Sequence, residues 1–186
     1  MREPVTADHL QAFMKSLAAA AKTPSRVYLV GGASSVLLGW RISTIDIDLK
    51  IIPESDETLR SLPRLKEKLH LNIELASPDD FIPELPGWQE RSRFIQQEGK
   101  LSFYHYDFYA QALAKIERGH EIDLKDVAHL FEKRLIEPGR LQQLFSAIED
   151  RMYLFPDLDP KSFRRAVERT LRENVGTMES QKDQSA

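Results

Sequence analysis

The sequence predicts an α/β fold of the α+β type, with a small mixed sheet flanked by helices and a helical C-terminal half. Two observations support this expectation. Short apolar or alternating segments with the period of strands occur at residues 26–30, 45–50, 71–76 and 101–106. Segments with helical spacing lie before and between them, and from residue 108 onward every periodic segment is helical. A chain of 186 residues can bury a core of this kind.

The N-terminal segment is predicted to begin with a helix. Thr6 or Asp8 can cap it, and apolar residues recur on one face as far as Lys22. The buried strand over residues 26–30 leads directly into a pair of glycines. Residues 33–38 then resemble the first turns of a helix. A strand, a glycine turn and a helix are therefore expected in direct succession.

Two further strands are predicted on either side of another helix. In residues 45–50, isoleucine and leucine alternate with aspartate and lysine, which is the pattern of a strand with one buried face. Ser55 starts a helix that reaches about Leu69, and Pro63 is expected to bend or interrupt it. Residues 71–76 alternate again and predict a third strand.

The rest of the chain is predicted to be mostly helical. Residues 77–88 are rich in proline and indicate a long ordered loop, and residues 101–106 a further strand, in which His105 is expected to be structural. The predicted helices are 108–117, 124–134, 140–152 and a last one from Pro160 to about Asn174. We expect a catalytic core with the N-terminal helix over residues 1–110, a helical part packing on it over 111–175, and a disordered polar tail over 176–186.

Two aspartates carry the clearest chemical signal. Asp46 and Asp48 alternate with apolar residues on one strand, so both carboxylates are expected on the same face, about 7 Å apart along the backbone. Carboxylate oxygens are hard ligands that suit Mg²⁺ or Mn²⁺. Two carboxylates on one face can share a divalent cation or bridge two of them, as in enzymes that displace a phosphate in line.

The glycine pair before this strand suits the binding of a phosphate chain. Gly31 and Gly32 let the backbone approach a triphosphate because they carry no Cβ atom. The amides from Ala33 to Ser35 would lie at a helix N-terminus, where anions bind well. The hydroxyls of Ser34 and Ser35 are candidates for further hydrogen bonds to phosphate oxygens.

Each of these features also has an ordinary explanation. A D-x-D pair on an alternating strand is most often a solvated face, and a Gly-Gly pair after a strand is most often a turn. Their order along the chain is much more specific. A strand, Gly-Gly, small hydroxyl residues, a short helix and then D-x-D on the next strand predict a site for metal-dependent nucleotidyl transfer.

These motifs resemble the minimal nucleotidyltransferases of the DNA polymerase β superfamily. The resemblance is carried by the two glycines, Gly39, Arg41, Thr44 and the D-x-D pair, and it implies a nucleotidyltransferase fold in which Arg41 and Thr44 support the site. The same pattern is similar to the catalytic head of tRNA CCA-adding enzymes. Those enzymes usually follow the glycines with Val-Arg-Asp, whereas this chain has Ala33-Ser34-Ser35 and lacks their long helical body.

A second motif resembles small bacterial nucleotidyltransferase-like proteins, including AbiEii-type toxins of toxin–antitoxin pairs. In that group a later helix carries a Lys, an Arg and a D-x-x-D motif, here Lys115, Arg118, Asp123 and Asp126. The resemblance implies that Lys115 and Arg118 bind the nucleotide, whose leaving pyrophosphate gains negative charge. Asp123 and Asp126 would hold these basic side chains in place or cap the next helix. Alternatively, both basic residues are ordinary surface charges.

Sites of the polymerase β type normally have a third carboxylate on a neighbouring strand. Glu74 is the best candidate, since it alternates with the apolar residues of its predicted strand. It would orient a metal or accept the proton of the attacking hydroxyl. Alternatively, it lies on a solvated face. Asp79 and Asp80 are weaker candidates because they follow Pro78 and fit a turn or a helix cap.

The composition excludes several other classes of protein. The net charge is −3, which argues against a strongly basic nucleic-acid surface over the whole chain. There is no cysteine, and therefore no disulfide framework or thiolate metal site. No apolar run has the length of a membrane span, and the N-terminus lacks the apolar core of a signal peptide. We expect a cytoplasmic location.

The function predicted from the sequence is transfer of a nucleoside monophosphate from a nucleoside triphosphate to a hydroxyl, with Mg²⁺ or Mn²⁺ as cofactor. The catalytic residues would be Asp46, Asp48 and Glu74. The acceptor could be an RNA or tRNA end, a protein or a small molecule, and the chain could belong to a toxin–antitoxin pair. The alternative is an inactive binding module with a nucleotidyltransferase fold, such as an antitoxin-type partner.

Overall fold

The computed structural model describes the backbone of residues 4–183 and the side chains of residues 4–174. Contacts between Cα atoms divide the chain into two compact units. Unit 1 comprises the chain up to Ser77 together with Arg91–Tyr106, and unit 2 comprises Pro78–Glu90 together with the chain from Asp107 onward. The predicted border lay near residue 110, and no sequence pattern indicated that the proline-rich segment groups with the C-terminal helices.

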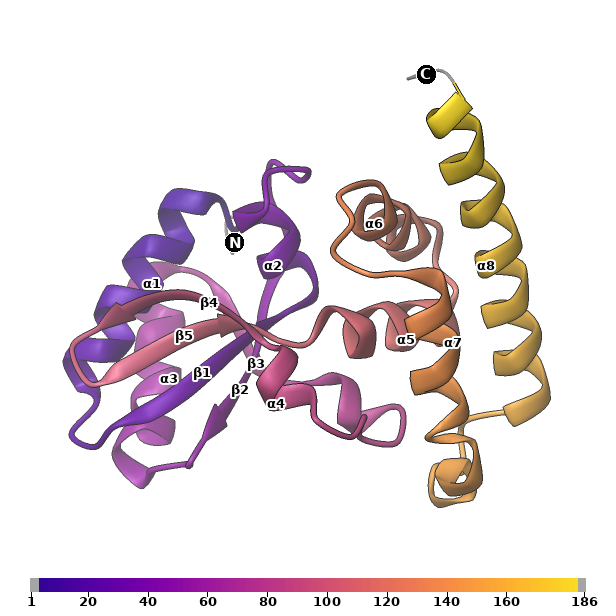
Figure 1. Cartoon of the computed structure of the whole chain (residues 1–186). Helices are drawn as coiled ribbons and strands as arrows, with labels where there is room; N and C mark the ends of the chain where they lie inside the picture. The colour runs from indigo at the N-terminus through magenta and orange to yellow at the C-terminus, as the bar shows by residue number, and fades with distance from the viewer. Residues whose placement is uncertain (1–3, 184–186) are drawn as a thin grey trace. The chain divides into compact units, whose positions relative to one another are not determined.

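Unit 1 contains a five-stranded mixed sheet in the order β3-β2-β1-β5-β4 (Figure 1). The pairs β1–β2 and β4–β5 are antiparallel, whereas β1–β5 and β2–β3 are parallel. This arrangement confirms the predicted fold class. The strands are β1 (Ser25–Val30), β2 (Asp46–Ile52), β3 (Asn72–Leu75), β4 (Arg93–Glu98) and β5 (Leu101–His105).

Three helices of unit 1 begin close to where the sequence predicts. Thr6, and not Asp8, caps the first helix and accepts a hydrogen bond from the backbone N–H of His9. Ser55 caps the third in the same way, and Pro63 lies within that helix without ending it. The second helix starts at the first glycine of the pair, two residues earlier than expected. The helices are α1 (Ala7–Ala20), α2 (Gly31–Leu37) and α3 (Asp56–Leu69).

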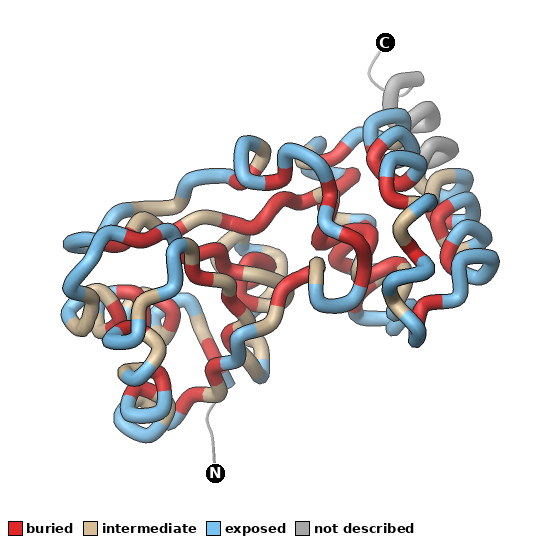
Figure 2. The backbone as a smooth tube through the Cα atoms, turned by 90° about the horizontal axis from the view of Figure 1, so that it is seen from below, coloured by how far each residue is buried: buried red, intermediate tan, exposed pale blue. Residues whose placement is uncertain are grey.

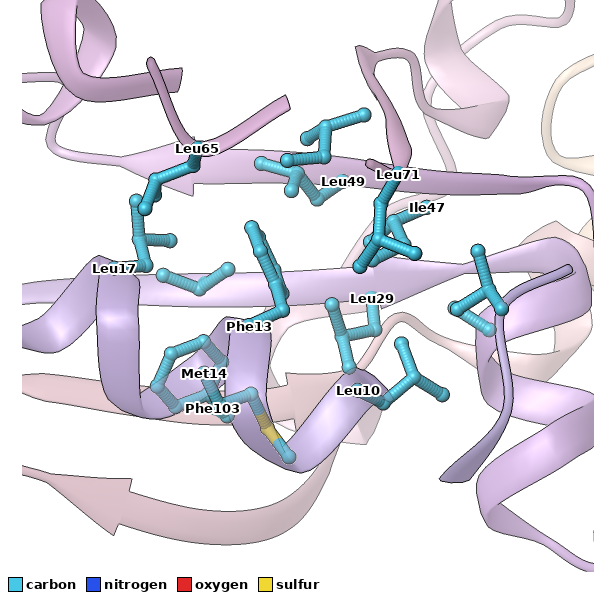
Figure 3. Packing of buried hydrophobic residues seen from close by; sticks show 14 of the residues in the cluster. Leu10, Phe13, Met14, Leu17, Leu29, Ile47, Leu49, Leu65, Leu71 and Phe103 are labelled. Atoms are coloured by element: carbon cyan, nitrogen blue, oxygen red, sulfur yellow. The ribbon is translucent and has the colours of Figure 1, made fainter. Parts of the chain in front are cut away.

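The core of unit 1 lies between one face of the sheet and the two helices α1 and α3. Figure 3 shows side chains of α1 pointing toward apolar residues of β1, β2 and β5. Each fully buried side chain of this size contributes about 1.5–3 kcal/mol relative to an exposed one. Because strand side chains alternate, the residues between these apolar positions project from the opposite face. The labelled residues are Leu10, Phe13, Met14, Leu17, Leu29, Ile47, Leu49, Leu65, Leu71 and Phe103.

Strand β4 was not predicted from the sequence. It is an edge strand of mixed composition, and a register shift between Phe94 and Gln96 interrupts its alternation. Phe94 contacts the ring of Tyr104, whereas the side chain of Gln96 exchanges hydrogen bonds with Gln11 of α1. A bulge of this kind places polar and apolar residues out of period, so the strand pattern is not visible in the sequence.

Unit 2 is helical, as predicted, although several bounds differ. Helix α8 packs against α5, α6 and α7 (Figure 1). Buried and exposed positions follow one another along the described part of the chain (Figure 2). The elements are η1 (Pro78–Asp80), α4 (Trp88–Arg91, whose last residue belongs to unit 1), α5 (Phe108–Arg118), α6 (Glu121–Glu132), α7 (Pro138–Ser146), η2 (Glu149–Leu154) and α8 (Pro160–Asp183).

Two expectations for the C-terminal part need correction. The helix predicted over residues 140–152 is divided, because α7 ends at Ser146 and a separate 3₁₀ helix follows; this arrangement buries both Ile148 and Met152. The last helix continues to Asp183, where the sequence predicts a disordered tail over 176–186; Met, Glu, Gln and Lys in this stretch all favour helix. Residues 184–186 lie outside the described part of the chain.

Among the described residues, no helix combines the length and the apolar composition that a membrane span requires.

Candidate active site

Four polar side chains from two adjacent strands occupy neighbouring positions on one face of the sheet in unit 1. The parallel register of β2 and β3 places Asp46 opposite Asn72 and Asp48 opposite Glu74. The alternate residues Ile47, Leu49 and Ile51 of β2 and Ile73 of β3 are buried in the core with α1 and α3, whereas Leu75 at the end of β3 is exposed. All four side chains therefore project from the face opposite that core. We call Asp46, Asp48, Asn72 and Glu74 the acidic quartet.

Asn72 joins two acids of this quartet. Its side-chain Nδ2 donates one hydrogen bond to Oδ1 of Asp46, at 2.5 Å, and one to Oε1 of Glu74, at 2.7 Å. Asn72 was missed as a candidate residue. The signal was present, because residues two apart on a strand share a face, so the alternation that selected Glu74 also places Asn72 beside it.

The first glycine of the pair lies against the D-x-D motif. Gly31 has φ +59°, a left-handed conformation that favours glycine, and a Cβ atom added there would lie 3.5 Å from Oδ2 of Asp48. The backbone register agrees, since Val30 pairs with Asp48 across β1 and β2. The glycine thus keeps the space beside this carboxylate free of a side chain.

The second glycine lies against the segment that leads into β2. A Cβ atom on Gly32 would come within 2.0 Å of Oγ1 of Thr44 and 3.4 Å of Nη1 of Arg41. Thr44 is itself fixed by a two-way backbone pairing with Val5, at 2.7 and 2.9 Å. Arg41 and Thr44, which the sequence suggested as supporting residues, therefore lie beside the glycine pair.

The two serines after the glycines are buried. Ser34 Oγ donates to the backbone oxygen of Leu29 at 3.0 Å, and Ser35 Oγ donates to that of Gly31 at 3.2 Å. Each hydroxyl has one hydrogen to donate, and both hydrogens are used inside the unit. This placement favours backbone groups over the serine hydroxyls as contacts for a phosphate chain.

His105 is a buried structural partner of Ser34. Its Nδ1 lies 3.0 Å from Ser34 Oγ, whose hydrogen goes to Leu29, so Nδ1 is the donor of this bond and carries the ring hydrogen. Burial, and secondarily the positive charge of Arg93, lower the pKa of His105 to about 4. The ring is therefore neutral at physiological pH and fits the structural role expected for it.

In unit 2, the second sequence motif forms a buried ion network between α5 and α6. Lys115 Nζ lies 3.1 Å from Oδ1 of Asp123 and 2.6 Å from Oδ2 of Asp126. The three side chains are only 7%, 4% and 3% exposed. Asp123 is the third residue of α6, whose N-cap is His120, so it does not cap this helix. Both aspartates instead hold Lys115.

Arg118 completes this network from its exposed side. Its Nε and Nη2 each donate to a different oxygen of Asp123, both at 2.8 Å, while 54% of its side chain is exposed. Burial opposes the charge on Asp123, but the hydrogen bond from Arg118 and the charge of Lys115 outweigh it and lower the pKa of this carboxyl. Both oxygens of Asp123 accept from Arg118, so the carboxylate is the favoured form.

The acidic quartet suits a cation that is only partly held by protein. No group of three or more His, Cys, Asp or Glu side chains in the described chain is placed to hold a metal ion by itself. Mg²⁺, however, is usually bound through one or two carboxylates together with substrate phosphates and water. Asp46 and Asp48 provide such carboxylates, and the space beside Gly31 borders one of them.

Comparison with known proteins points to one family. The model of a family described as "Nucleotidyltransferase of unknown function (DUF6036)" matches residues 8–172, a span that includes the acidic quartet and the network of unit 2. Comparison with curated proteins and with solved structures yields no match. None of these comparisons links the chain to AbiEii-type toxins.

Proposed function

The chain belongs to the DUF6036 family of nucleotidyltransferases of unknown function, and from this premise we propose that it transfers a nucleoside monophosphate from a nucleoside triphosphate to a hydroxyl group. The observation that carries the proposal is the acidic quartet. Two carboxylates on β2, a third on β3 and a glycine beside Asp48 supply the groups that such a transfer needs.

Asp46 and Asp48 are the proposed metal ligands. A bound Mg²⁺ or Mn²⁺ would neutralise the phosphate charge and stabilise the attacking and leaving oxygens. Asp46 and Asp48 would bind the triphosphate only through a cation, because their carboxylates repel the phosphate oxygens directly. The position of these two carboxylates would therefore set the position of the triphosphate. Gly31 leaves room for the phosphate chain to reach that place.

Glu74 is the proposed general base. The oxygen of the acceptor hydroxyl attacks the α-phosphorus and forms a new O–P bond, while the bond from that phosphorus to the α–β bridging oxygen breaks and pyrophosphate leaves. The hydroxyl proton passes to Glu74 and then to solvent. Support comes from its pairing with Asp48 and from the hydrogen bond that Asn72 donates to it, which holds the carboxylate in the quartet.

For the basic residues of unit 2, the structure supports different roles. Lys115 is buried and held by two carboxylates, so we assign it a structural role. Arg118 is more than half exposed and keeps a guanidinium nitrogen, Nη1, outside its two bonds to Asp123. Of these two basic residues, Arg118 is therefore the candidate for the nucleotide contact that the sequence resemblance implies.

For the acceptor we propose a chemical class and not a particular molecule. The resemblance to nucleotidyltransferase-like toxins favours an RNA 3′ end as the first acceptor to test, followed by protein and small-molecule hydroxyls. A role in a toxin–antitoxin pair rests on that resemblance alone.

Transfer of label from each α-³²P-labelled triphosphate to total RNA and to protein, with Mg²⁺ or Mn²⁺, tests the proposal. The variant Asp46→Asn/Asp48→Asn should lose the transfer, because two neutral amides bind a divalent cation much more weakly than two carboxylates. Asp56→Asn, an exposed change on α3 that removes one surface ion pair, is the control and should keep it. If the wild type and Asp56→Asn label one of the two fractions and the double variant does not, that fraction contains the acceptor.

The same experiment distinguishes the inactive alternative. A purified chain that labels no fraction but is still stabilised against heat by a triphosphate is a nucleotide-binding module. A chain that shows neither transfer nor stabilisation contradicts the proposed function altogether.

A further inference from the structure

Asn72 lies beside Asp46 and Glu74 in the acidic quartet and is absent from the sequence motifs that predicted the site. It is paired with Asp46 across β2 and β3, and it lies two residues before Glu74 on the same strand face. Its two amide hydrogens are directed to two different carboxylates, of Asp46 and of Glu74. The side chain thus connects one proposed metal ligand with the proposed base.

The chemistry of the neighbours fixes the orientation of this amide. If the amide were turned over, its Oδ1 would face two carboxylate oxygens, which are acceptors as well, and both hydrogen bonds would be lost. With Nδ2 toward the acids, a neutral donor lies between two negative groups and offsets their repulsion. Two acidic neighbours therefore select the observed orientation.

The two hydrogen bonds use only one oxygen of each acid. They engage Oδ1 of Asp46 and Oε1 of Glu74, at 2.5 and 2.7 Å. A side chain fixed through one carboxylate oxygen has a defined direction for the other. Groups that orient metal-binding side chains in this way commonly change metal affinity 10–100-fold when they are removed.

We propose that Asn72 is a positioning residue that holds Asp46 and Glu74 in the orientation required for cation binding and proton transfer. This inference rests on the proposed function, because it assigns the cation to Asp46 and Asp48. It goes beyond that function by adding a neutral amide to the three acids. The amide links the metal ligand to the base, so the two acids are oriented together.

The test measures binding of Mn²⁺ alone to the full chain, from the electron paramagnetic resonance signal of the free ion. Asn72→Ala should weaken Mn²⁺ binding about tenfold or more. Gln97→Ala is the matched control: Gln97 is an exposed amide on β4 of the same sheet, and it donates to the backbone oxygen of Gly99. Its Mn²⁺ affinity should stay within twofold of the wild type.

Asn72→Asp provides a second, independent reading from melting temperatures. This change keeps the size of the side chain, removes both donors and adds a negative charge beside two others. Without metal, its melting temperature should fall further than that of Asn72→Ala. Mn²⁺ should then raise it by more than it raises the wild type, because the cation takes over the neutralising role of the amide.

The outcomes separate this inference from the proposed function. Asn72→Ala with Mn²⁺ affinity within twofold of the wild type, or a wild type that binds no Mn²⁺, overturns the positioning role. If the wild type transfers label and Asn72→Ala binds Mn²⁺ normally, only the inference fails. If Asn72→Ala weakens Mn²⁺ binding but the wild type labels no acceptor, the positioning role stands and the proposed transfer fails.

Discussion

Asp48 on β2 and Glu74 on β3 are directly opposite each other in two neighbouring parallel strands. The two acids are separated in the sequence by the whole of α3, which returns the chain so that β3 can pair with β2 in parallel. Neighbouring positions across such a pair place Cβ atoms about 5 Å apart, close enough for the side chains to act on one group. The candidate site therefore depends on the pairing of a strand only four residues long.

We predict that Glu74→Gln lowers the rate of nucleotidyl transfer about 10²–10⁴-fold, because a glutamine cannot take the proton of the attacking hydroxyl. The affinity for the triphosphate should stay within a few-fold, since Asp46 and Asp48 remain. The kinetic constants kcat and KM for the triphosphate, measured separately, check this. Glu67→Gln on the exposed side of α3 is the control, and an unchanged kcat in Glu74→Gln would remove Glu74 from the mechanism.

Gly32→Ala should destabilise the protein by about 1–3 kcal/mol, because its Cβ would overlap Thr44, at 2.0 Å from Oγ1 and 2.7 Å from Cβ. Gly139→Ala is the matched control, since no atom lies within 4 Å of the added methyl and the residue is inside helix α7. Alanine favours helix, so this control should be neutral or stabilising. Urea unfolding of both variants measures the difference. A Gly32→Ala variant as stable as the wild type would contradict the close packing of Gly32 against Thr44.

Lys115→Met should cost about 3–5 kcal/mol of unfolding free energy, because it leaves buried carboxylate charge without its partner. Lys125→Met, which breaks an exposed ion pair with Glu121 on the neighbouring α6, should cost much less than Lys115→Met, because solvent screens that pair. If both variants lose the same free energy of unfolding, the buried network of Lys115, Asp123 and Asp126 stabilises the protein no more than an exposed ion pair does.

Arg118→Gln should raise KM for the triphosphate about tenfold, because a neutral side chain cannot pair with phosphate oxygens. Stability should fall less than in Lys115→Met, since Arg118 is more than half exposed and the buried Asp123 keeps its bond from Lys115. Arg140→Gln, another exposed arginine of unit 2, is the control. If KM is the same in both variants, Arg118 is an ordinary surface charge that closes the network of Lys115.

Acidification should destabilise the protein through His105. Its pKa is about 4 in the folded state, below the ordinary value of 6.5, so the unfolded chain binds the proton more readily. The stabilisation is complete above pH 6.5 and is lost as the pH falls toward 4. The free energy of unfolding at pH 5 should be about 2 kcal/mol lower than at neutral pH. Urea unfolding between pH 7.5 and 5 should show this loss in the wild type and a smaller one in His105→Gln.

The exposed His70 provides a control for this pH dependence. It follows α3 in a left-handed conformation, and its substitution by Asn, which tolerates that conformation, should leave the slope of stability against pH unchanged. A wild-type slope that persists in His105→Gln would mean that another group takes up the proton.

Several features of the fold and the candidate site could be read from the sequence because they depend on local periodicity. The alternation around Asp46 and Asp48 places them on one strand face, which β2 confirms. The caps at Thr6 and Ser55 follow from short-range hydrogen bonds between a side chain and the nearby backbone. Such patterns involve residues only a few positions apart, so they can be recognised without knowledge of the tertiary structure.

Other features could not be predicted from the chain, because they depend on which segments pair and pack against each other in the folded protein. Alternation along the chain indicates Asp46, Asp48 and Glu74 as candidates, whereas the register of β2 and β3 places Asn72 where it connects two of them. Packing turned Ser34 inward, although it follows the glycines that predicted a phosphate contact. A pattern along the chain determines the face on which a side chain lies, whereas its partner depends on the segment that folds against that face.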